Sequence, residues 1–394
     1  MKAPRGFALS GVRAGLRKQG NDLTLIHCEG GATGAAVFTR NLFQAAPVVL
    51  SRASLKAAKG RVSAVVINAG CATAITGKAG MDAARRVQSR AAELLDVPRN
   101  EVFVASTGVI GVVLPHEKLT KAMPLAVTRL SHGGLEAASR AILTTDAGPK
   151  VATATFRHGG RLGHVTGFAK GAGMIHPSMA TMLAFVMTDA AAPPGVLKSA
   201  LTKAVDASFN AISVDGDTST NDTVLLLASG KLGNEPIADL EGDGASFLAA
   251  VTSVCRSLAR MITRDGEGAT RLLEITVKGA KNEREAKLAA HAIGTSPLVK
   301  TALHGGDPNW GRILAAVGRS GARFSPAKVS LSVGPLALVT NGAPTNYKET
   351  DAARLFAKEE VPILVDLAAG KGSAHLLTCD LGHDYVSLNV DYRS

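Results

Sequence analysis

One hydroxyl of this chain stands where it could attack the chain's own backbone. Thr181 precedes the apolar segment MLAFVM and follows Ala180, the last residue of a loop of mostly small residues, KGAGMIHPSMA. A threonine hydroxyl is a weak nucleophile until a base takes its proton. Attack on the carbonyl of Ala180, followed by hydrolysis of the ester, would cut the chain and free the α-amine of Thr181. That amine, with a pKa of about 7.7–8.0, could then act as the base for its own hydroxyl, an arrangement suited to acyl transfer.

Acyl transfer also needs hydrogen-bond donors for the oxyanion that forms on the attacked carbonyl. The sequence STGVIG offers the hydroxyl of Thr107 and the backbone N–H of Gly108 at the end of an expected strand. Glycine lets the backbone approach a ligand closely, and one such donor contributes roughly 2.7–4 kcal/mol to transition-state stabilisation. Taken singly, each motif also has a plainer interpretation. STG fits a strand-to-helix turn, and a threonine that opens a buried strand is usually only a β-branched strand residue.

Three further polar motifs lie in the second half of the chain. RDGEG at 264–268 fits a solvated turn when it is taken alone. DGDTSTND at 215–222 lacks the ligand order and closing glutamate of a calcium-binding EF-hand, so we predict a hydrogen-bonded turn near a site. GDPNWGR at 306–312 predicts a helix N-cap followed by the start of a helix.

The bulk composition predicts a globular, intracellular protein. Apolar residues make up 46% and charged residues 19%, and no apolar run approaches the ~20 residues that span a bilayer. The opening MKAPRGF lacks the apolar core of a signal peptide. The cysteines show no metal-binding spacing, which favours the reducing cytoplasm and no metal. They are Cys28, Cys71, Cys255 and Cys379.

The net charge of +12 fits either a nucleic-acid partner or small substrates that carry carboxylates or phosphates. Lysine and arginine are scattered, and aromatic residues are few, which argues against nucleic acid. Charge alone leaves both interpretations open.

Alternating apolar strands and amphipathic helices predict an α/β protein. Both faces of 181–187 are apolar, so we expect that strand to lie in a sheet covered on both sides. Breaks near 192 and 282 predict three domains, at 1–192, 193–281 and 282–394. The expected strands are 23–27, 46–51, 63–68, 101–106, 151–156, 163–168, 181–187, 223–227, 270–278, 362–367, 374–379 and 385–390. The expected helices are 81–95, 118–130, 135–143, 196–207, 245–262 and one that begins after 282.

Six motifs in a fixed order resemble those of the ornithine acetyltransferase (ArgJ) family. They are KGAGMIHPSMATML, STGVIG, DTSTNDT, RDGEGAT, GDPNWGRI and HDYVSLNVDYRS, and the similarity runs from about Gly6 to Ser394. The resemblance implies an αββα sandwich of the aminopeptidase DmpA type with smaller α/β domains. It also implies self-cleavage between Ala180 and Thr181 into an α chain, 1–180, and a β chain, 181–394, with two copies of each in a heterotetramer.

The chemistry implied by the resemblance is acetyl transfer in arginine biosynthesis. Acetyl would pass from N2-acetylornithine to Thr181 and then to glutamate, with Thr107 and Gly108 as the oxyanion hole. No metal or redox cofactor, nucleic acid or membrane is implied; acetyl-CoA as a second donor would add an amino-acid N-acetyltransferase activity. Lys170 can meet a substrate carboxylate and Glu267 an ammonium. The implied substrate-binding residues are Thr144, Lys170, Thr181, Glu267, Asn389 and Ser394.

The chain departs from the family pattern at a few positions. Cys71 and Thr73 stand where asparagines are usual, Ala147 follows TTD in place of threonine, and Ser394 replaces threonine but keeps a hydroxyl. Two alternatives remain open at this stage. One is a DmpA-like aminopeptidase or amidase, which we would expect to carry serine as its nucleophile. The other is an uncleaved, non-catalytic binding protein for acidic metabolites.

Overall fold

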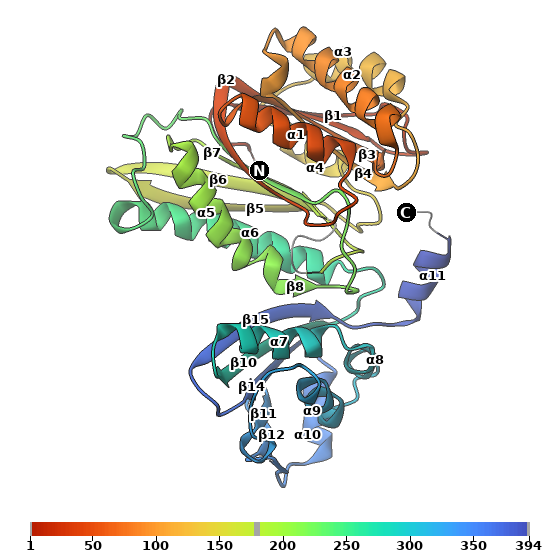
Figure 1. Ribbon diagram of the computed structural model, residues 1–394, viewed down its shortest axis with the longest axis vertical. Helices are drawn as coiled ribbons and strands as arrows, with labels where there is room; N and C mark the ends of the chain where they lie inside the picture. Colours follow the sequence, from red (N-terminus) through yellow and green to blue (C-terminus); the bar gives the residue numbers. More distant parts are fainter. Residues whose placement is uncertain (1, 177–181, 392–394) are drawn as a thin grey trace. The chain divides into compact units, whose positions relative to one another are not determined.

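The computed structural model describes residues 2–176 and 182–391, which form two compact units (Figure 1). The first unit lies within 1–210 and 217–262, and the second within 211–216 and 263–393. This division does not follow the boundaries expected at 192 and 281. The proline-rich break at 191–194 instead leads directly into helix α5 (Pro194–Asp206), whose N-cap is Pro193. Strand β9 (Thr223–Ala228) then pairs inside the first sheet, between β2 and β7.

The first unit is built on one sheet of eight strands among the described residues, in the order β4-β3-β2-β9-β7-β6-β5 with β1 on β2. Besides β9, the strands are β1 (Phe7–Val12), β2 (Leu23–Phe38), β3 (Arg61–Cys71), β4 (Val102–Val109), β5 (Lys150–His158), β6 (Arg161–Lys170) and β7 (Leu183–Thr188). The 16-residue β2 pairs with β1 and β3 along its first part and with β9 along its last. Its register with β3 shifts where Gly30 and Gly31 adopt positive φ. Bulged, glycine-containing positions bend a strand, so β2 belongs to two layers.

Side chains alternate between the two faces of each layer. Val65 and Ile67 of β3 join the apolar cluster that holds Phe168 and Phe185 of the other layer, whereas Val66 joins the cluster beneath the helices. Helices cover the outer faces, with α1 and α2 over β3 and β4, α3 over β1 and β2, α5 over β2 and β9, and α6 against β6 (Figure 1). The expected αββα sandwich is therefore confirmed. The remaining helices of this unit are α1 (Ala46–Ala57), α2 (Gly77–Leu95), α3 (His116–Thr128), α4 (Leu135–Ala141) and α6 (Ala245–Arg264), with short 3-10 turns at Arg99–Glu101, Phe209–Ala211 and Gly242–Gly244.

Helix α6 packs closely on the sheet. A Cβ added to Gly167 of β6 would lie 2.9 Å from Val254 and 3.0 Å from Leu258, so this small residue lets the helix approach. Among the described residues, the stretch 242–264 is the one helix long and apolar enough to span a membrane. The core helix of a soluble protein passes the same test, and Val251, Val254 and Leu258 are buried here.

The second unit holds a seven-stranded sheet among the described residues, in the order β13-β12-β11-β14-β10-β15-β8. Its strands are β8 (Ile212–Ser213), β10 (Leu272–Ala280), β11 (Ser330–Val333), β12 (Leu336–Thr340), β13 (Ala343–Pro344), β14 (Glu360–Asp366) and β15 (Gly372–Cys379). Its helices are α7 (Glu283–Gly294), α8 (Pro297–Gly305), α9 (Trp310–Gly318), α10 (Glu349–Phe356) and α11 (His383–Asp391), with a 3-10 turn at Pro326–Lys328. The expected N-cap is confirmed, because the Asn309 side chain accepts a hydrogen bond from the Arg312 amide at the start of α9.

Two expected strands are helices in the structure. Residues 46–51 begin α1, where Pro47 fits the first helical turn and Val48 and Ser51 are buried on one face. Residues 385–390 lie in α11, which satisfies its own backbone hydrogen bonds and leaves Val386 exposed. Short apolar runs do not distinguish strand from helix by periodicity, which accounts for both errors. The other expected elements are confirmed within the described residues, with shifted ends.

Candidate acyl-transfer site

The residues around the expected cut fix one end of the site. Ala180 and Thr181 lie outside the described residues, as does Ser394. Met182 is described, and its amide donates a hydrogen bond of 3.0 Å to Asp222 Oδ1. The Met182 carbonyl accepts from the amide of Thr223 at 3.1 Å. The backbone amide and the backbone carbonyl of Met182 are therefore both held by hydrogen bonds.

Strand pairing brings a predicted substrate residue to the same place. Leu183, the first residue of β7, pairs with Lys170 at the end of β6 and with Thr223 at the start of β9. Antiparallel partners face one another across the ladder, so Lys170 lies opposite Leu183, which follows Thr181 by two residues in the sequence.

The predicted oxyanion residues end β4. Gly108 has φ +125°, and it pairs with Gly70 of β3. A Cβ at Gly108 would lie 2.6 Å from the backbone nitrogen of Cys71, so no side chain fits here without displacing the backbone. Thr107, the residue before it, is buried. Glycine at 108 is thus required by both its dihedral angle and its surroundings.

Two asparagines hold this strand end in place. The Asn221 side chain donates to the carbonyls of Ala72 at 2.7 Å and Ser106 at 2.8 Å, which ties the two turns together. Asn68 accepts from the Ser106 hydroxyl at 2.6 Å and donates to the Cys71 carbonyl at 2.9 Å. The segment DGDTSTND is hydrogen-bonded, since the Asn221 backbone amide also donates to the Ser219 hydroxyl at 3.1 Å, but its backbone forms bends and not the predicted turn. The sequence reasoning did not assign Asn68 or Asn221 a role, although both lie in motifs that it singled out.

Cys71, one of the departures from the family pattern, is packed rather than reactive. Its Sγ lies 3.3 Å from the Val112 carbonyl, in hydrogen-bonding range. Burial raises the pKa of the Cys71 thiol, which keeps it in the protonated form that is a poor nucleophile. All four cysteines are free and buried.

Lys170 joins three predicted site residues. Its ammonium donates to the hydroxyl of Thr144 at 2.7 Å and lies 3.5 Å from the hydroxyl of Thr107. The side chain is buried. An ammonium can only donate, so both threonine oxygens act as acceptors toward it.

A buried carboxylate that the sequence reasoning missed organises this cluster. Asp146 Oδ1 accepts from Lys150 Nζ at 2.7 Å and from the Gly171 amide at 2.6 Å, and Oδ2 accepts from the Thr144 amide at 3.0 Å. Lys170 Nζ lies 3.7 Å from Oδ2. Burial alone would raise the pKa of Asp146, but the two ammonium groups and the hydrogen bonds hold it well below its usual range. In this buried cluster two ammonium groups face the one carboxylate of Asp146.

Asp222, beside the expected cut, has the opposite electrostatics. Full burial raises the pKa of its carboxyl well above the ordinary value, because the hydrogen bonds it accepts do not compensate for lost hydration. Its Oδ2 has no hydrogen-bond partner among the residues that the structure describes. The same carboxyl accepts the hydrogen bond of the Met182 amide, next to Thr181 in the sequence.

The second unit brings two other predicted site residues together. The Asn389 side-chain amide donates to Glu267 Oε2 at 2.9 Å. Gly268, with φ +69°, lets the RDGEG turn approach α11, since a Cβ there would lie 2.5 Å from the Tyr385 nitrogen. The Tyr385 hydroxyl lies 3.4 Å from Asp215 Oδ2. RDGEG is thus a packed turn that supports α11, and not only a solvated one.

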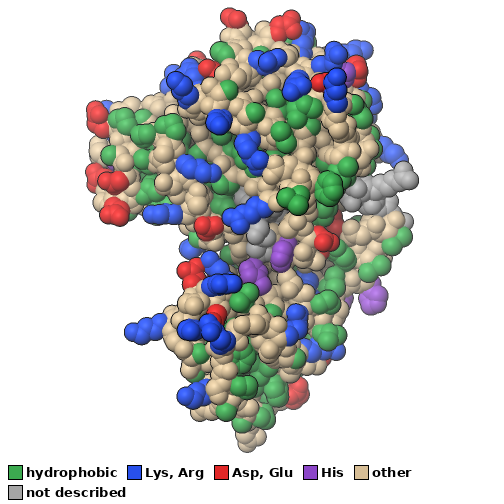
Figure 2. Space-filling view, in the orientation of Figure 1, with side chains coloured by type: hydrophobic (Ala, Val, Ile, Leu, Met, Phe, Trp, Pro, Cys, Tyr) green, Lys and Arg blue, Asp and Glu red, His purple; other side chains and the backbone are tan. Residues whose placement is uncertain are grey.

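The face of the molecule drawn in Figure 2 shows no concentrated basic patch among the described residues. On the face drawn in Figure 2, Lys and Arg side chains are dispersed, with Asp and Glu among them.

Comparison with known proteins gives a consistent result. Residues 8–394 match the model of the ArgJ family. The curated "Arginine biosynthesis bifunctional protein ArgJ" of Caldanaerobacter subterraneus subsp. tengcongensis is 45% identical over 100% of this chain and 98% of its own. The protein of the same name from Chlorobaculum tepidum is 46% identical over 99% of this chain and 96% of its own. A crystal structure of the bifunctional protein argJ from Bacillus halodurans is 42% identical, covers 53% of this chain and 98% of that chain, and has a TM-score of 0.51.

Proposed function

The chain belongs to the ArgJ family, and from this premise we propose that it is a self-cleaving acetyltransferase of arginine biosynthesis. It moves acetyl from N2-acetylornithine to Thr181 and from there to glutamate. The observation that carries the proposal is the contact of Lys170, which pairs with Leu183 at the start of β7, with both Thr107 and Thr144. Because Thr107 accepts from the ammonium, its own hydrogen can point to an oxyanion.

Self-cleavage begins with attack of the Thr181 hydroxyl on the carbonyl carbon of Ala180. The bond from that carbon to the Thr181 nitrogen breaks, and the nitrogen takes up the hydroxyl proton. Water then hydrolyses the ester, which leaves a carboxylate on Ala180 and a free amine and hydroxyl on Thr181. The hydrogen bonds of Met182 to Asp222 and Thr223 support this step, because they restrain the backbone next to the reacting bond.

Acetyl transfer repeats the same chemistry on a bound substrate. The α-amine of Thr181 takes the hydroxyl proton as the oxygen attacks the acetyl carbonyl of N2-acetylornithine, and that proton passes to the departing ornithine amine. Thr107 and Gly108 stabilise the oxyanion. The amine of glutamate then attacks the acetyl ester and regenerates the Thr181 hydroxyl, so the cycle is ping-pong.

Substrate binding is divided between cationic and anionic groups. Lys170 and Thr144, which contact each other in the first unit, meet polar groups of the substrate. The paired Glu267 and Asn389 of the second unit hold an ammonium, and Ser394 adds a contact. No step requires a metal or a redox cofactor.

The second activity and the assembly belong to the same proposal. Acetyl-CoA serves as an additional acetyl donor, which the word "bifunctional" in the relatives' names supports. The buried free cysteines favour the cytoplasm. Two α and two β chains form the active particle.

Denaturing electrophoresis of the purified protein tests the proposal. We expect two fragments, 1–180 and 181–394, and turnover of N2-acetylornithine with glutamate. Thr181→Ala should remain one intact chain without activity, whereas Thr181→Ser keeps a hydroxyl and should still be cut. An intact wild-type band after long incubation would contradict self-cleavage, and activity in the alanine variant would contradict Thr181 as nucleophile.

A further inference from the structure

Arg17 lies in a loop that is fixed by a buried anion. Asp22 is fully buried, and its carboxylate accepts hydrogen bonds from four successive backbone amides. The donors are Ala14 at 2.5 Å, Gly15 at 3.0 Å, Leu16 at 2.6 Å and Arg17 at 2.9 Å. Hydrogen bonds to a charged group contribute roughly 1.5–3 kcal/mol each, so the loop between β1 and β2 has one well-defined conformation. The Arg17 side chain therefore starts from a rigid backbone.

This side chain reaches the end of β3 and the loop that follows α4, two places next to proposed site residues. Its Nη1 donates to the carbonyl of Leu143 at 2.9 Å, and Leu143 directly precedes Thr144. Its stem crosses Gly70, because a Cβ added to Gly70 would lie 3.0 Å from Arg17 Cγ. Gly70 is the strand partner of Gly108. One residue thus touches the immediate neighbours of two proposed site residues.

The guanidinium has capacity for another partner. It is half-buried and makes no ion pair with any described residue, and only one of its donors is used in the hydrogen bond to Leu143. Lys170 donates to the Thr144 hydroxyl, so the adjacent residues Leu143 and Thr144 each accept a hydrogen bond from a cation. Lys150 already pairs with Asp146. A planar guanidinium matches a carboxylate with two parallel hydrogen bonds.

We propose that Arg17 binds the α-carboxylate that N2-acetylornithine and glutamate share, opposite Lys170. This inference rests on the proposed acetyl transfer and deepens it. In both substrates the reacting nitrogen and the α-carboxylate sit on the same carbon. A cation next to the proposed oxyanion hole can therefore bind that carboxylate in both half-reactions. This holds although ornithine and glutamate have different side chains.

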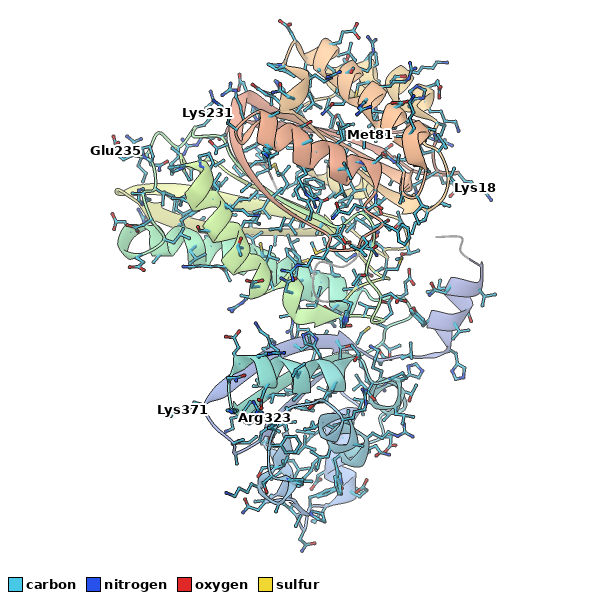
Figure 3. The ribbon with its side chains drawn as sticks, viewed as in Figure 1. Lys18, Met81, Lys231, Glu235, Arg323 and Lys371 are labelled. Atoms are coloured by element: carbon cyan, nitrogen blue, oxygen red, sulfur yellow. The ribbon has the colours of Figure 1, made fainter. Side chains whose placement is uncertain are left out.

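The test compares two donors in three variants. N2-acetylornithine carries the negatively charged α-carboxylate that Arg17 would bind, whereas its α-carboxamide is neutral at that position. We expect Arg17→Gln to lower kcat/KM for the carboxylate donor by roughly 10- to 100-fold, the loss of a charged hydrogen bond, and to change the carboxamide rate little. Arg17→Lys keeps a cation and should retain most of the preference. Lys18→Gln is the matched control, because Lys18 is exposed at the edge of the first unit (Figure 3).

The readout is the ratio of kcat/KM for the carboxylate donor to kcat/KM for the carboxamide donor. If Arg17 had only a structural role, its substitution would lower both values and leave this ratio unchanged. Equal losses for both donors, or an unchanged ratio in Arg17→Gln, would overturn the assignment. A KM for glutamate that does not rise in the same variant would also overturn it. All variants should still show the two fragments. If the wild-type protein is neither cut nor active, the acetyl-transfer proposal itself is overturned. Failure of the Arg17 proposal and failure of the proposed function are therefore distinguishable.

Discussion

Gly108 and Gly70 face each other across β3 and β4 so closely that a Cβ on Gly108 would lie 2.7 Å from the Cα of Gly70. The strand ends therefore meet backbone to backbone at the proposed oxyanion hole. The stem of Arg17 covers Gly70 from the loop that Asp22 fixes. This contact sets where the Gly108 amide can point.

Gly108→Ala should damage catalysis more than stability. The new methyl group must displace the β3 backbone, which moves the oxyanion donor, and loss of one such donor costs roughly 10²- to 10³-fold in kcat. Gly111→Ala is the control, since Gly111 also has positive φ, +82°, but nothing lies within 4 Å of its added Cβ. Steady-state assays and thermal melts of both variants check this. Equal losses of kcat would show that backbone strain, and not the close approach, is responsible.

Asp146→Asn should destabilise the first unit by about 3–5 kcal/mol, because it leaves two buried ammonium groups without their anion. The pKa of Asp146 is depressed in the folded state, so its contribution is full above the ordinary carboxyl pKa and is lost as the pH falls through the folded value. Urea unfolding from neutral to acidic pH should show the gap between variant and wild type closing in acid. Asp82→Asn, which removes an exposed pair with Arg85, should have little effect. A gap that is independent of pH would contradict the prediction.

Asp222 predicts a pH dependence of the opposite sign. Its pKa is raised in the folded state, so the stability it contributes is full below the ordinary carboxyl pKa and is lost as the pH rises through the folded value. Asp222→Asn cannot ionise and should gain stability relative to wild type as the pH rises. It keeps an acceptor for the Met182 amide and should still be cut.

Asp222→Ala, in contrast, removes that acceptor and should slow cleavage. A time course of fragment formation, with unfolding midpoints at several pH values, measures both effects. Cleavage at the wild-type rate in the alanine variant would show that the Met182 hydrogen bond does not position the reacting peptide.

Glu267→Gln should weaken binding of the ornithine-bearing donor without affecting cleavage. The carboxylate that would hold an ammonium becomes neutral, while the hydrogen bond from Asn389 to the same side chain can persist. We expect KM for N2-acetylornithine to rise about tenfold. Glu274→Gln, also in the second unit, is the control. An unchanged KM would remove Glu267 from the substrate contacts.

Local sequence patterns predicted most elements and part of the site. β3 and α2 follow from their periodicity, and the grouping of Thr107, Thr144 and Lys170 followed from the family motifs. Asp146 and Asn221 were not assigned roles, because their importance comes from partners that the fold, and not the local sequence, brings near. Asn221 reaches Ser106 only because β9 inserts beside β2, and strand order is not encoded in local periodicity.

That same strand order has a consequence for the cleaved molecule. β7 and β9 come from the segment after the proposed cut, yet they lie between β2 and β6 from the segment before it. The two fragments are interleaved within one sheet, and neither can leave without breaking ladders on both sides. Unfolding of the cut protein then yields two separate molecules, whereas the uncut Thr181→Ala chain yields one. Refolding of the cut form becomes an association reaction, with a midpoint that shifts with protein concentration. A cut that leaves the folded state in place thus changes the molecularity of folding.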